Sequence, residues 1–238
     1  MLTLTQYYFR LRKKYFYKVE ESEIIRKLIK PGMIAADLGA NDGYHTLLMA
    51  DCVGQNGKVF SFEPESTAFG LLQNNVIKHG FKNIQLIQKA VVHKSEKRPF
   101  YLCQDQPGSH SLFSSERHIR GGVIETITLD EFLEPYQQKL DYLKLDIEGS
   151  ELLALKGSKK VLIKNKNLII FFEYNQEVLS RSGEEPSLLL DYLSDNDFHY
   201  FYKANRRMKS PLKVSKSDIA NIQKGMYWNA VCSRNPLN

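Results

Sequence analysis

The chain of 238 residues is predicted to fold as an α/β domain, with a largely parallel sheet that carries helices on both faces. Three observations predict this class. Short apolar runs alternate with segments of helical periodicity from residue 33 onward, which is typical of repeated β-then-α units. Glycine and proline separate many of these segments, as they do at turns. The length suits one large domain that buries a full core without disulfide bonds.

The N-terminal part is expected to be a helical extension over residues 1–30, which Pro31 and Gly32 end. Its apolar residues form two stripes at helical spacing, on Leu4, Tyr8, Leu11 and Tyr15 and then on Ile24, Ile25, Leu28 and Ile29. The domain itself is expected over residues 31–238. Its first elements are expected as strand 33–38, helix 43–52, strand 58–62, helix 66–79 and strand 84–91.

The middle section, residues 92–128, departs from this alternation. Two extra strands are expected at 100–102 and 123–127, with the polar loop 106–111 between them. A long loop inside a compact domain is usually functional or disordered. The alternation then resumes, with expected elements at strand 141–147, a helix from residue 150, strand 167–174, helix 186–195 and strands 198–202 and 226–231.

Composition excludes few partners. The net charge of +6 permits an anionic partner without identifying one. Cys52, Cys103 and Cys232 form no CxxC pattern, so we expect reduced thiols in a cytoplasmic protein. Basic residues interrupt the apolar N-terminal stretch, which argues against a signal peptide, and no run approaches the roughly 20 apolar residues that span a bilayer. No pattern predicts the oligomeric state.

The strongest functional signal is the turn that follows the first expected strand, from Asp37 through Gly39 to Gly43. Glycine tolerates positive φ and lets a ligand approach the backbone, and ligands of open α/β sheets bind beyond the carboxyl ends of the strands. Glu63 ends the next strand, where a carboxylate can accept both ribose hydroxyls. The G-x-G-x-x-G motif of dinucleotide enzymes is absent. The pair of acids therefore favours S-adenosylmethionine as the ligand, over the alternative of an ordinary βα turn.

A second signal is the charged end of the strand 141–147. Period-two alternation puts Lys144, Asp146 and Glu148 on one face, where charges are costly unless paired or at the strand end. We expect Lys144 to pair with Glu173 of the next strand in a structural ion pair, and Ser150 with Glu151 to stabilise the following helix. For Asp146, which faces the same crevice as the glycine turn, we expect a functional role.

Other candidates carry two interpretations each. Most loop histidines are only solvated, but His110 lies in a loop that would contact substrate if it closed over the site. The catalytic candidates are Asp146, His110 and Glu173. The segment Tyr7–Lys18 mixes aromatic and basic residues, which suits peripheral contact with a membrane surface and equally suits a helix packed on the domain. We rank packing first.

The ordered motifs make the chain resemble the FkbM family of S-adenosylmethionine-dependent O-methyltransferases. The matching stretches are DLGANDGYHTLLMA from Asp37, GKVFSFEPE from Gly57, Ala90-Val91, ETITLDEFL from Glu125, LDYLKLDIEGSELLALKG from Leu140 and IIFFEYN from Ile169. The resemblance runs from about Pro31 to Asn175. Beyond Asn175 the chain fits only the general pattern of class I methyltransferases.

The resemblance implies a Rossmann-like domain with seven strands, the last of them antiparallel. It also implies donor-binding roles at the motif positions and at the methionine end of the donor, which are Asp37, Gly39, Ala40, Asn41, Tyr44, Glu63, Pro64, Ala90 and Asp146. The acceptors implied are hydroxyls on sugars, glycolipids or related natural products, presented as small molecules or linked to a glycan or lipid.

Three alternatives are open. The net positive charge suggests a methyltransferase of RNA, although the chain lacks the Asn-Pro-Pro-Tyr type of motif found in many base methyltransferases, and we rank nucleic acid below a small acceptor. A non-catalytic protein that binds S-adenosylmethionine is the second alternative. Catechol-type enzymes hold a metal at these strand ends, and Asp146, Glu173 and Asn175 could imitate that set. The set is too incomplete, so we expect no metal.

Overall fold

The computed structural model describes residues 19–106, 108–203, 212–222 and 226–237. The first expected stripe of the N-terminal extension and its basic aromatic segment, Tyr7–Lys18, lie outside these residues. The second stripe lies on helix α2 (Val19–Leu28) and just after it, and all four of its members are buried. They pack in one core with β-strand residues such as Ala35 and Phe171. The domain boundary at residue 30 stays a prediction.

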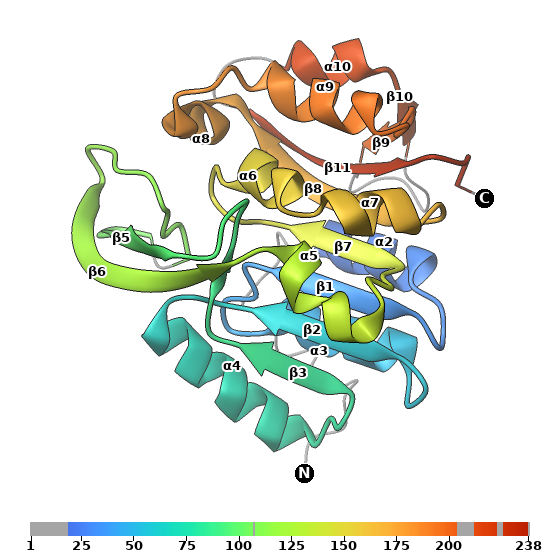
Figure 1. Ribbon diagram of the computed structural model, residues 1–238, viewed down its shortest axis with the longest axis horizontal. Helices are drawn as coiled ribbons and strands as arrows, with labels where there is room; N and C mark the ends of the chain where they lie inside the picture. Colours follow the sequence, from blue (N-terminus) through green and yellow to red (C-terminus); the bar gives the residue numbers. More distant parts are fainter. Residues whose placement is uncertain (1–18, 107, 204–211, 223–225, 238) are drawn as a thin grey trace.

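The main sheet has eight strands in the order β10-β9-β11-β8-β7-β1-β2-β3 (Figure 1). Their bounds are β1 Ile34–Leu38, β2 Lys58–Phe62, β3 Ile84–Ile87, β7 Tyr142–Leu145, β8 Ile169–Asn175, β9 Tyr200–Lys203, β10 Leu212–Val214 and β11 Tyr227–Ser233. Strands β3, β2, β1, β7 and β8 pair in parallel, and β11 runs antiparallel to both β8 and β9. The expected seven strands with an antiparallel last strand are therefore confirmed, and the short β10 adds an eighth at the edge.

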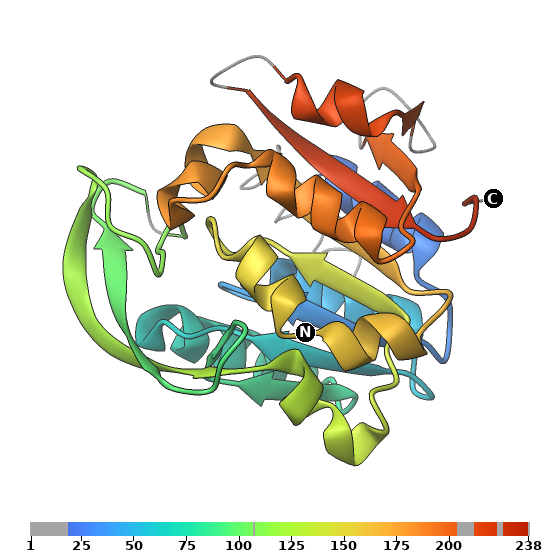
Figure 2. The same ribbon diagram turned by 45° about the horizontal axis from the view of Figure 1, so that its top comes forward.

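Helices cover both faces of the sheet, so the molecule has three layers (Figures 1 and 2). One face carries α5 (Leu129–Phe132), α6 (Glu151–Lys156), α7 (Lys159–Lys164), α9 (Ser187–Asp195) and α10 (Lys216–Ala220). The other face carries α2, α3 (Tyr44–Val53) and α4 (Ser66–His79). The remaining described helices are the short elements η2 (Glu134–Tyr136), α8 (Gln176–Leu179) and η3 (Ser180–Ser182).

Local sequence explains where the helices near the site begin and end. Helix α4 begins after Glu65, whose side chain accepts a hydrogen bond from the backbone N–H of Ala68 at 2.7 Å. It ends at Gly80, which has a φ of 72°, the left-handed conformation that glycine adopts without strain. Helix α3 begins directly after the glycine turn of β1, so the turn is fixed between a buried strand and a buried helix.

A second sheet of three strands, in the order β4-β6-β5, forms an arm beside the main sheet. Its strands are β4 (Ala90–Val91), β5 (Lys97–Cys103) and β6 (His118–Ile127), and Figure 2 shows β5 and β6 curving away from the main sheet. The single strand expected at 84–91 is wrong. The strand breaks after Ile87, and Ala90 and Val91 pair with Thr126 and Ile127 of β6 instead. The chain thus leaves the main sheet to build the arm.

In the part of the chain that the structure describes, no helix combines the length and the apolar character needed to cross a membrane.

Candidate active site

The glycine turn after β1 passes directly over the end of β7. Gly39 has a φ of 80°, and a Cβ atom there would lie 1.9 Å from the carbonyl oxygen of Asp146. The backbone N–H groups of Gly39 and Ala40 both donate to the carbonyl of Phe62, each at 3.0 Å. Asn41 follows with a φ of 52°, which asparagine tolerates better than most residues. Only glycine fits position 39, because a side chain would collide with backbone.

Glu63 is a buried carboxylate at the end of β2, with 7% of its surface exposed. Its Oε2 accepts the backbone N–H of Asn41 at 2.8 Å, and its Oε1 accepts that of Glu65 at 2.9 Å. Burial raises its pKa to about 7, although these two hydrogen bonds oppose the shift. Each oxygen keeps a further lone pair that can accept a hydrogen bond. The arrangement fits a ligand that brings two hydroxyl donors, as a ribose does.

A pocket, which we call the donor pocket, lies beyond the carboxyl ends of β1, β2 and β7, with the arm as its remaining wall. Its lining residues are Leu38, Gly39, Ala40, Asn41, His45, Phe62, Glu63, Pro64, Ala68, Lys89, Ala90, Val91, Phe100, Gly108, His110, Ser111, Leu112, Asp146, Ile147, Glu148 and Ser150. Seven of the nine residues predicted to bind the donor line this pocket.

Asp37 does not line the donor pocket. It is fully buried beneath it, where its Oδ2 accepts the hydroxyl of Thr46 at 2.7 Å and its Oδ1 lies 3.4 Å from the Nζ of Lys144. The same Nζ lies 3.1 Å from the Oδ2 of Asp146. Lys144 therefore pairs with Asp37 and Asp146, and the predicted pair with Glu173 is wrong. The register of β7 and β8 sets Lys144 opposite Phe171, two residues before Glu173.

Tyr44 is also outside the lining of the donor pocket. Its hydroxyl shares a hydrogen bond of 2.7 Å with Ser22 on α2, so the side chain points toward that helix. The neighbouring His45 does line the pocket, and its Nε2 lies 2.7 Å from the Oε2 of Glu21. These two contacts tie α2 to the start of α3. The predicted direct contact of Tyr44 with the donor has no support in this arrangement.

A second pocket adjoins the donor pocket and shares Asn41, Gly108, Asp146 and Glu148 with it. Its lining is mostly polar and strongly charged, and consists of Glu21, Asn41, Cys103, Gln106, Gly108, Ser109, Arg117, His118, Asp146, Glu148, Glu173, Asn175, Glu177, Val178, Arg181 and Tyr227. The catalytic candidates Asp146 and Glu173 meet here. His110 lines only the donor pocket, so the structure does not bring all three catalytic candidates together.

Burial and crowding of carboxylates shift the acids of the second pocket. Burial first, and then the charges of Asp146, Glu148 and Glu151, raise the pKa of Glu173 well above its ordinary value. Burial raises the pKa of Glu148 to about 7, with Asp146 adding to the shift and Arg181 opposing it. Both carboxyl groups thus titrate nearer to neutral pH than an ordinary glutamate, as groups that exchange protons in a reaction often do.

Sequence reasoning missed several residues of the donor pocket. Phe100 and Leu112 come from the arm, whose path over the pocket no local pattern predicts. Ser150 was expected to cap α6, but its side chain makes no capping hydrogen bond. Its buried hydroxyl has no hydrogen-bond partner among the described residues and lines the pocket. Glu148 could have been found, because the alternation that selected Asp146 puts it on the same face.

Among the described residues no group of three or more His, Cys, Asp or Glu side chains has the geometry to hold a metal ion. The reaction without a metal stays a prediction.

Comparison with known proteins identifies the family. Among curated proteins, the chain is 32% identical over 59 residues to a protein-L-isoaspartate O-methyltransferase from Methanococcoides burtonii, a match that covers 25% of this chain and 29% of that protein. Two solved structures share the fold. They are the methyltransferase FkbM from Methylobacillus flagellatus (TM-score 0.54, 15% identity, 91% of this chain and 52% of that chain) and an rRNA methylase from Streptococcus thermophilus (TM-score 0.50, 11% identity, 90% and 93%).

The family model called the methyltransferase FkbM domain matches residues 37–200, well over half of the chain. The match begins at Asp37, before the glycine turn, and includes Glu63, Asp146 and Glu173. With the fold and the family motifs in agreement, this chain belongs to the FkbM family of methyltransferases.

Proposed function

We propose that the protein transfers a methyl group from S-adenosylmethionine to a hydroxyl of a sugar, a glycolipid or a related polar natural product. The observation that carries this proposal is the position of Asp146, which lines both the donor pocket and the second pocket. A group at such a junction lies where a donor and an acceptor would meet. Holding two reactants in this way supplies a large part of the rate in a displacement reaction.

The donor pocket suits S-adenosylmethionine in two respects. Glu63 is buried and presents oxygens for two ribose hydroxyls, and the bare backbone at Gly39 leaves room that a Cβ atom would remove. The unpaired hydroxyl of Ser150 offers one further polar contact. When bound, S-adenosylmethionine supplies a methyl group on a sulfonium, which is already activated for in-line displacement. The protein therefore has to orient the reactants and remove one proton.

Asp146 is the proposed proton acceptor. The acceptor hydroxyl must lose its proton as its oxygen bonds to the methyl carbon, and a positioned base contributes roughly 10²–10⁴-fold to such a step. Geometry selects Asp146 over Glu173, because Glu173 lines only the second pocket. Glu173 is also the poorer base, because its raised pKa keeps its carboxyl group protonated near neutral pH. His110 lines only the donor pocket and is not proposed as the base.

The lining of the second pocket supports a hydroxyl-rich acceptor. Amide side chains from Asn41, Gln106 and Asn175 join the carboxylates, and such groups hydrogen-bond sugar hydroxyls. Tyr227, which is 55% exposed, supplies a phenol ring that can stack on a sugar face. Aliphatic surface is scarce there. A long lipid chain would have to lie outside the pocket, with only its polar head inside.

A transfer assay tests the proposal. The purified protein is incubated with tritium-labelled S-adenosylmethionine and, separately, with glycan, polar-lipid and RNA extracts. We expect label in the glycan or polar-lipid fraction, as a methyl ether that resists mild base. The Asp146→Asn variant should bind S-adenosylhomocysteine within about 5-fold of the wild type and transfer methyl groups at least roughly 10²-fold more slowly. Label in RNA alone would favour the RNA methyltransferase, and no transfer by the wild type to any fraction would favour a binding protein.

The same assay tests the predicted independence from metal. We expect dialysis against EDTA to leave the rate of transfer unchanged, because the carboxylates near Asp146 do not form a recognisable ligand set among the described residues. A rate that EDTA abolishes and magnesium restores would show that the metal-free mechanism is wrong.

A further inference from the structure

We propose that His110 recognises the adenosine part of the bound donor. Its ring is held as one neutral tautomer, and the Nε2–H of that tautomer donates a hydrogen bond to the adenosine. This inference rests on the proposed function, because it assumes that the donor pocket takes S-adenosylmethionine. It assigns His110 to donor recognition, where sequence reasoning had ranked it among the catalytic candidates.

The tautomer follows from one hydrogen bond. The backbone N–H of Cys103 donates to the Nδ1 of His110 at 3.0 Å. The lone pair of Nδ1 is thereby used, and a neutral imidazole carries its single proton on the other nitrogen. Nε2 is then a donor without a lone pair to offer. A histidine in this state can hydrogen-bond an acceptor atom of a ligand, but it cannot remove a proton from a hydroxyl.

We place the ring at the adenosine end of the donor pocket, because it contacts Phe100, which packs in one apolar cluster with Ala90, and because the charge of Glu65 acts on it. It lines the pocket together with Glu63, Ala90 and Phe100, and it takes no part in the second pocket. Its ring meets Phe100 edge to face, with centroids 6.2 Å apart and an angle of 80°. Glu63 marks the ribose position, so the acceptor atoms within reach of this wall belong to the nucleoside rather than to the methionine.

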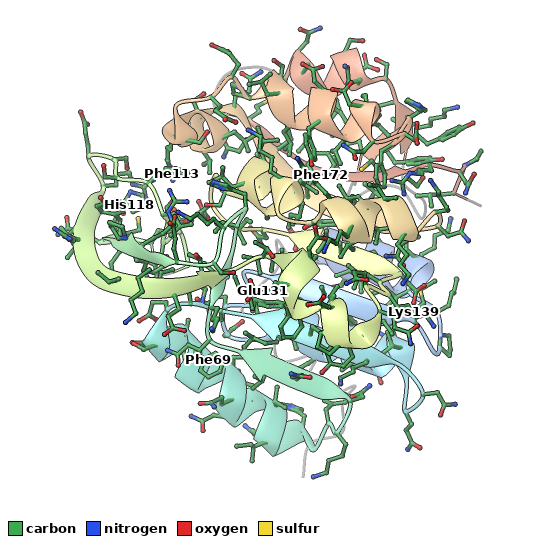
Figure 3. All side chains as sticks on the ribbon, viewed as in Figure 1. Phe69, Phe113, His118, Glu131, Lys139 and Phe172 are labelled. Carbon is green, nitrogen blue, oxygen red and sulfur yellow. The ribbon has the colours of Figure 1, made fainter. Side chains whose placement is uncertain are left out.

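The segment that carries His110 is fastened on both sides. The backbone of Ser111 exchanges two hydrogen bonds with Tyr101 of β5, at 2.9 and 3.0 Å, and its hydroxyl donates to the carbonyl of Glu148 at 2.7 Å. His118, labelled in Figure 3 at the start of β6, contacts the carbonyl of Ser109 through its Nε2 at 2.9 Å. Residues 109–111 therefore present His110 in a fixed orientation, which is what selective recognition requires.

Burial favours the neutral form of His110. Burial lowers its pKa, Glu65 opposes that shift and His118 adds to it. Protonation would also place an Nδ1–H against the N–H of Cys103, so two donors would face each other. The neutral imidazole is the form that keeps the hydrogen bond from Cys103 and leaves Nε2–H free to donate to the ligand.

Two substitutions separate the two nitrogens. The amide oxygen of Asn lies near the position of Nδ1, so His110→Asn can keep the bond to Cys103 while it loses the donor at Nε2. The amide nitrogen of Gln reaches the position of Nε2, so His110→Gln keeps a donor toward the ligand. We expect calorimetry with S-adenosylhomocysteine to show an affinity about 10-fold weaker for His110→Asn, about that of one lost hydrogen bond. His110→Gln should stay within about 3-fold of the wild type.

The control is His93→Asn, at an exposed position outside both pockets, which should bind like the wild type. Equal binding by His110→Asn and the wild type would overturn the inference. A wild type that binds no S-adenosylhomocysteine would overturn the proposed function itself and the inference with it. An independent readout is the ¹⁵N NMR spectrum of the unliganded protein. We expect the Nε2–H tautomer of His110, and the Nδ1–H tautomer would contradict the inference even if binding followed expectation.

Discussion

Lys144 shows how a buried residue can shape the site without touching a ligand. Its side chain is 1% exposed and lies between the carboxylates of Asp37 and Asp146. Burial lowers the pKa of Lys144, but the carboxylates of Asp146, Asp37 and Glu21 outweigh burial and raise this pKa above its ordinary value. The ammonium thus stays charged and fixes one oxygen of Asp146. Asp37, predicted to bind the donor, lies outside the pocket lining and pairs with Lys144, so its role in donor binding stays a prediction.

Removing Lys144 should therefore destabilise the fold. We expect Lys144→Met to lower the free energy of unfolding by about 3–5 kcal/mol, because it leaves Asp37 buried without a cation. Adding Asp37→Asn should recover much of that loss, since the buried charge is then gone as well. Urea denaturation measures the free energy of unfolding of the single and of the double variant. As a control, Lys156→Met breaks a half-exposed pair with Glu184 and should cost no more than about 1 kcal/mol. Equal losses for Lys144→Met and Lys156→Met would contradict the account.

Glu63 should make stability depend on pH. In the folded protein its pKa of about 7 lies above the ordinary value of 4.5. Its favourable contribution to the free energy of unfolding is therefore complete below pH 4.5 and is lost as the pH rises to about 7. Glu63→Gln has no such charge. We therefore compare the free energy of unfolding of Glu63→Gln with that of the wild type, both without ligand. The difference should shift in favour of the variant by about 3 kcal/mol between pH 4.5 and 7 and stay constant at higher pH. Urea titrations from pH 4.5 to 8.5 measure this difference, and a flat difference would show that Glu63 ionises freely.

At the scale of elements, the arm of β5 and β6 is the part of the fold that binding should change most. Phe100, His110 and Leu112 of the arm and its loop line the donor pocket, while much of β6 is exposed. Exposed elements with few buried contacts open more readily than the central strands. A ligand in the donor pocket should therefore stabilise the arm against local opening.

Hydrogen exchange tests this expectation. With S-adenosylhomocysteine at about 100 times its dissociation constant, the amide protons of Tyr101, Cys103 and Ser111 should exchange up to roughly 100-fold more slowly. Those of the central strand β7 provide the internal reference. Protection around Glu63 without any slowing in the arm would mean that the arm does not cover the donor.

The elements also show what sequence can and cannot predict. Strand β2 and helix α4 occur at the predicted residues, because their apolar periodicity, caps and glycine stops are local signals. The strand expected at 84–91 failed, since Ala90 and Val91 have a distant partner in β6 that no local pattern names. The residues of the site divide in the same way, into those that local signals predict and those that only tertiary packing brings in. Gly39 and Glu63 follow from strand ends and turn chemistry, whereas Phe100 and Leu112 enter the pocket through tertiary packing alone.

For the whole molecule, charge is distributed unevenly. The chain carries a net charge of +6, yet carboxylates outnumber arginines in the lining of the second pocket. Phosphate groups of a polynucleotide would meet only two arginines in that lining. We expect RNA binding to be weak, with a shallow fall of log K against log salt that corresponds to only one or two phosphate contacts. A steep slope together with methylation of RNA would contradict this expectation and favour the RNA methyltransferase.

The central claim is that Glu63 and the turn at Gly39 form the binding site for the donor nucleoside. Calorimetric titration of S-adenosylhomocysteine into the wild type, Glu63→Ala, Gly39→Val and the control Glu184→Ala tests it most directly. We expect binding by the wild type and by Glu184→Ala, whose position lies outside both pockets, and an affinity at least about 100-fold weaker for the other two variants. Binding by folded Glu63→Ala with the affinity of the wild type would contradict it.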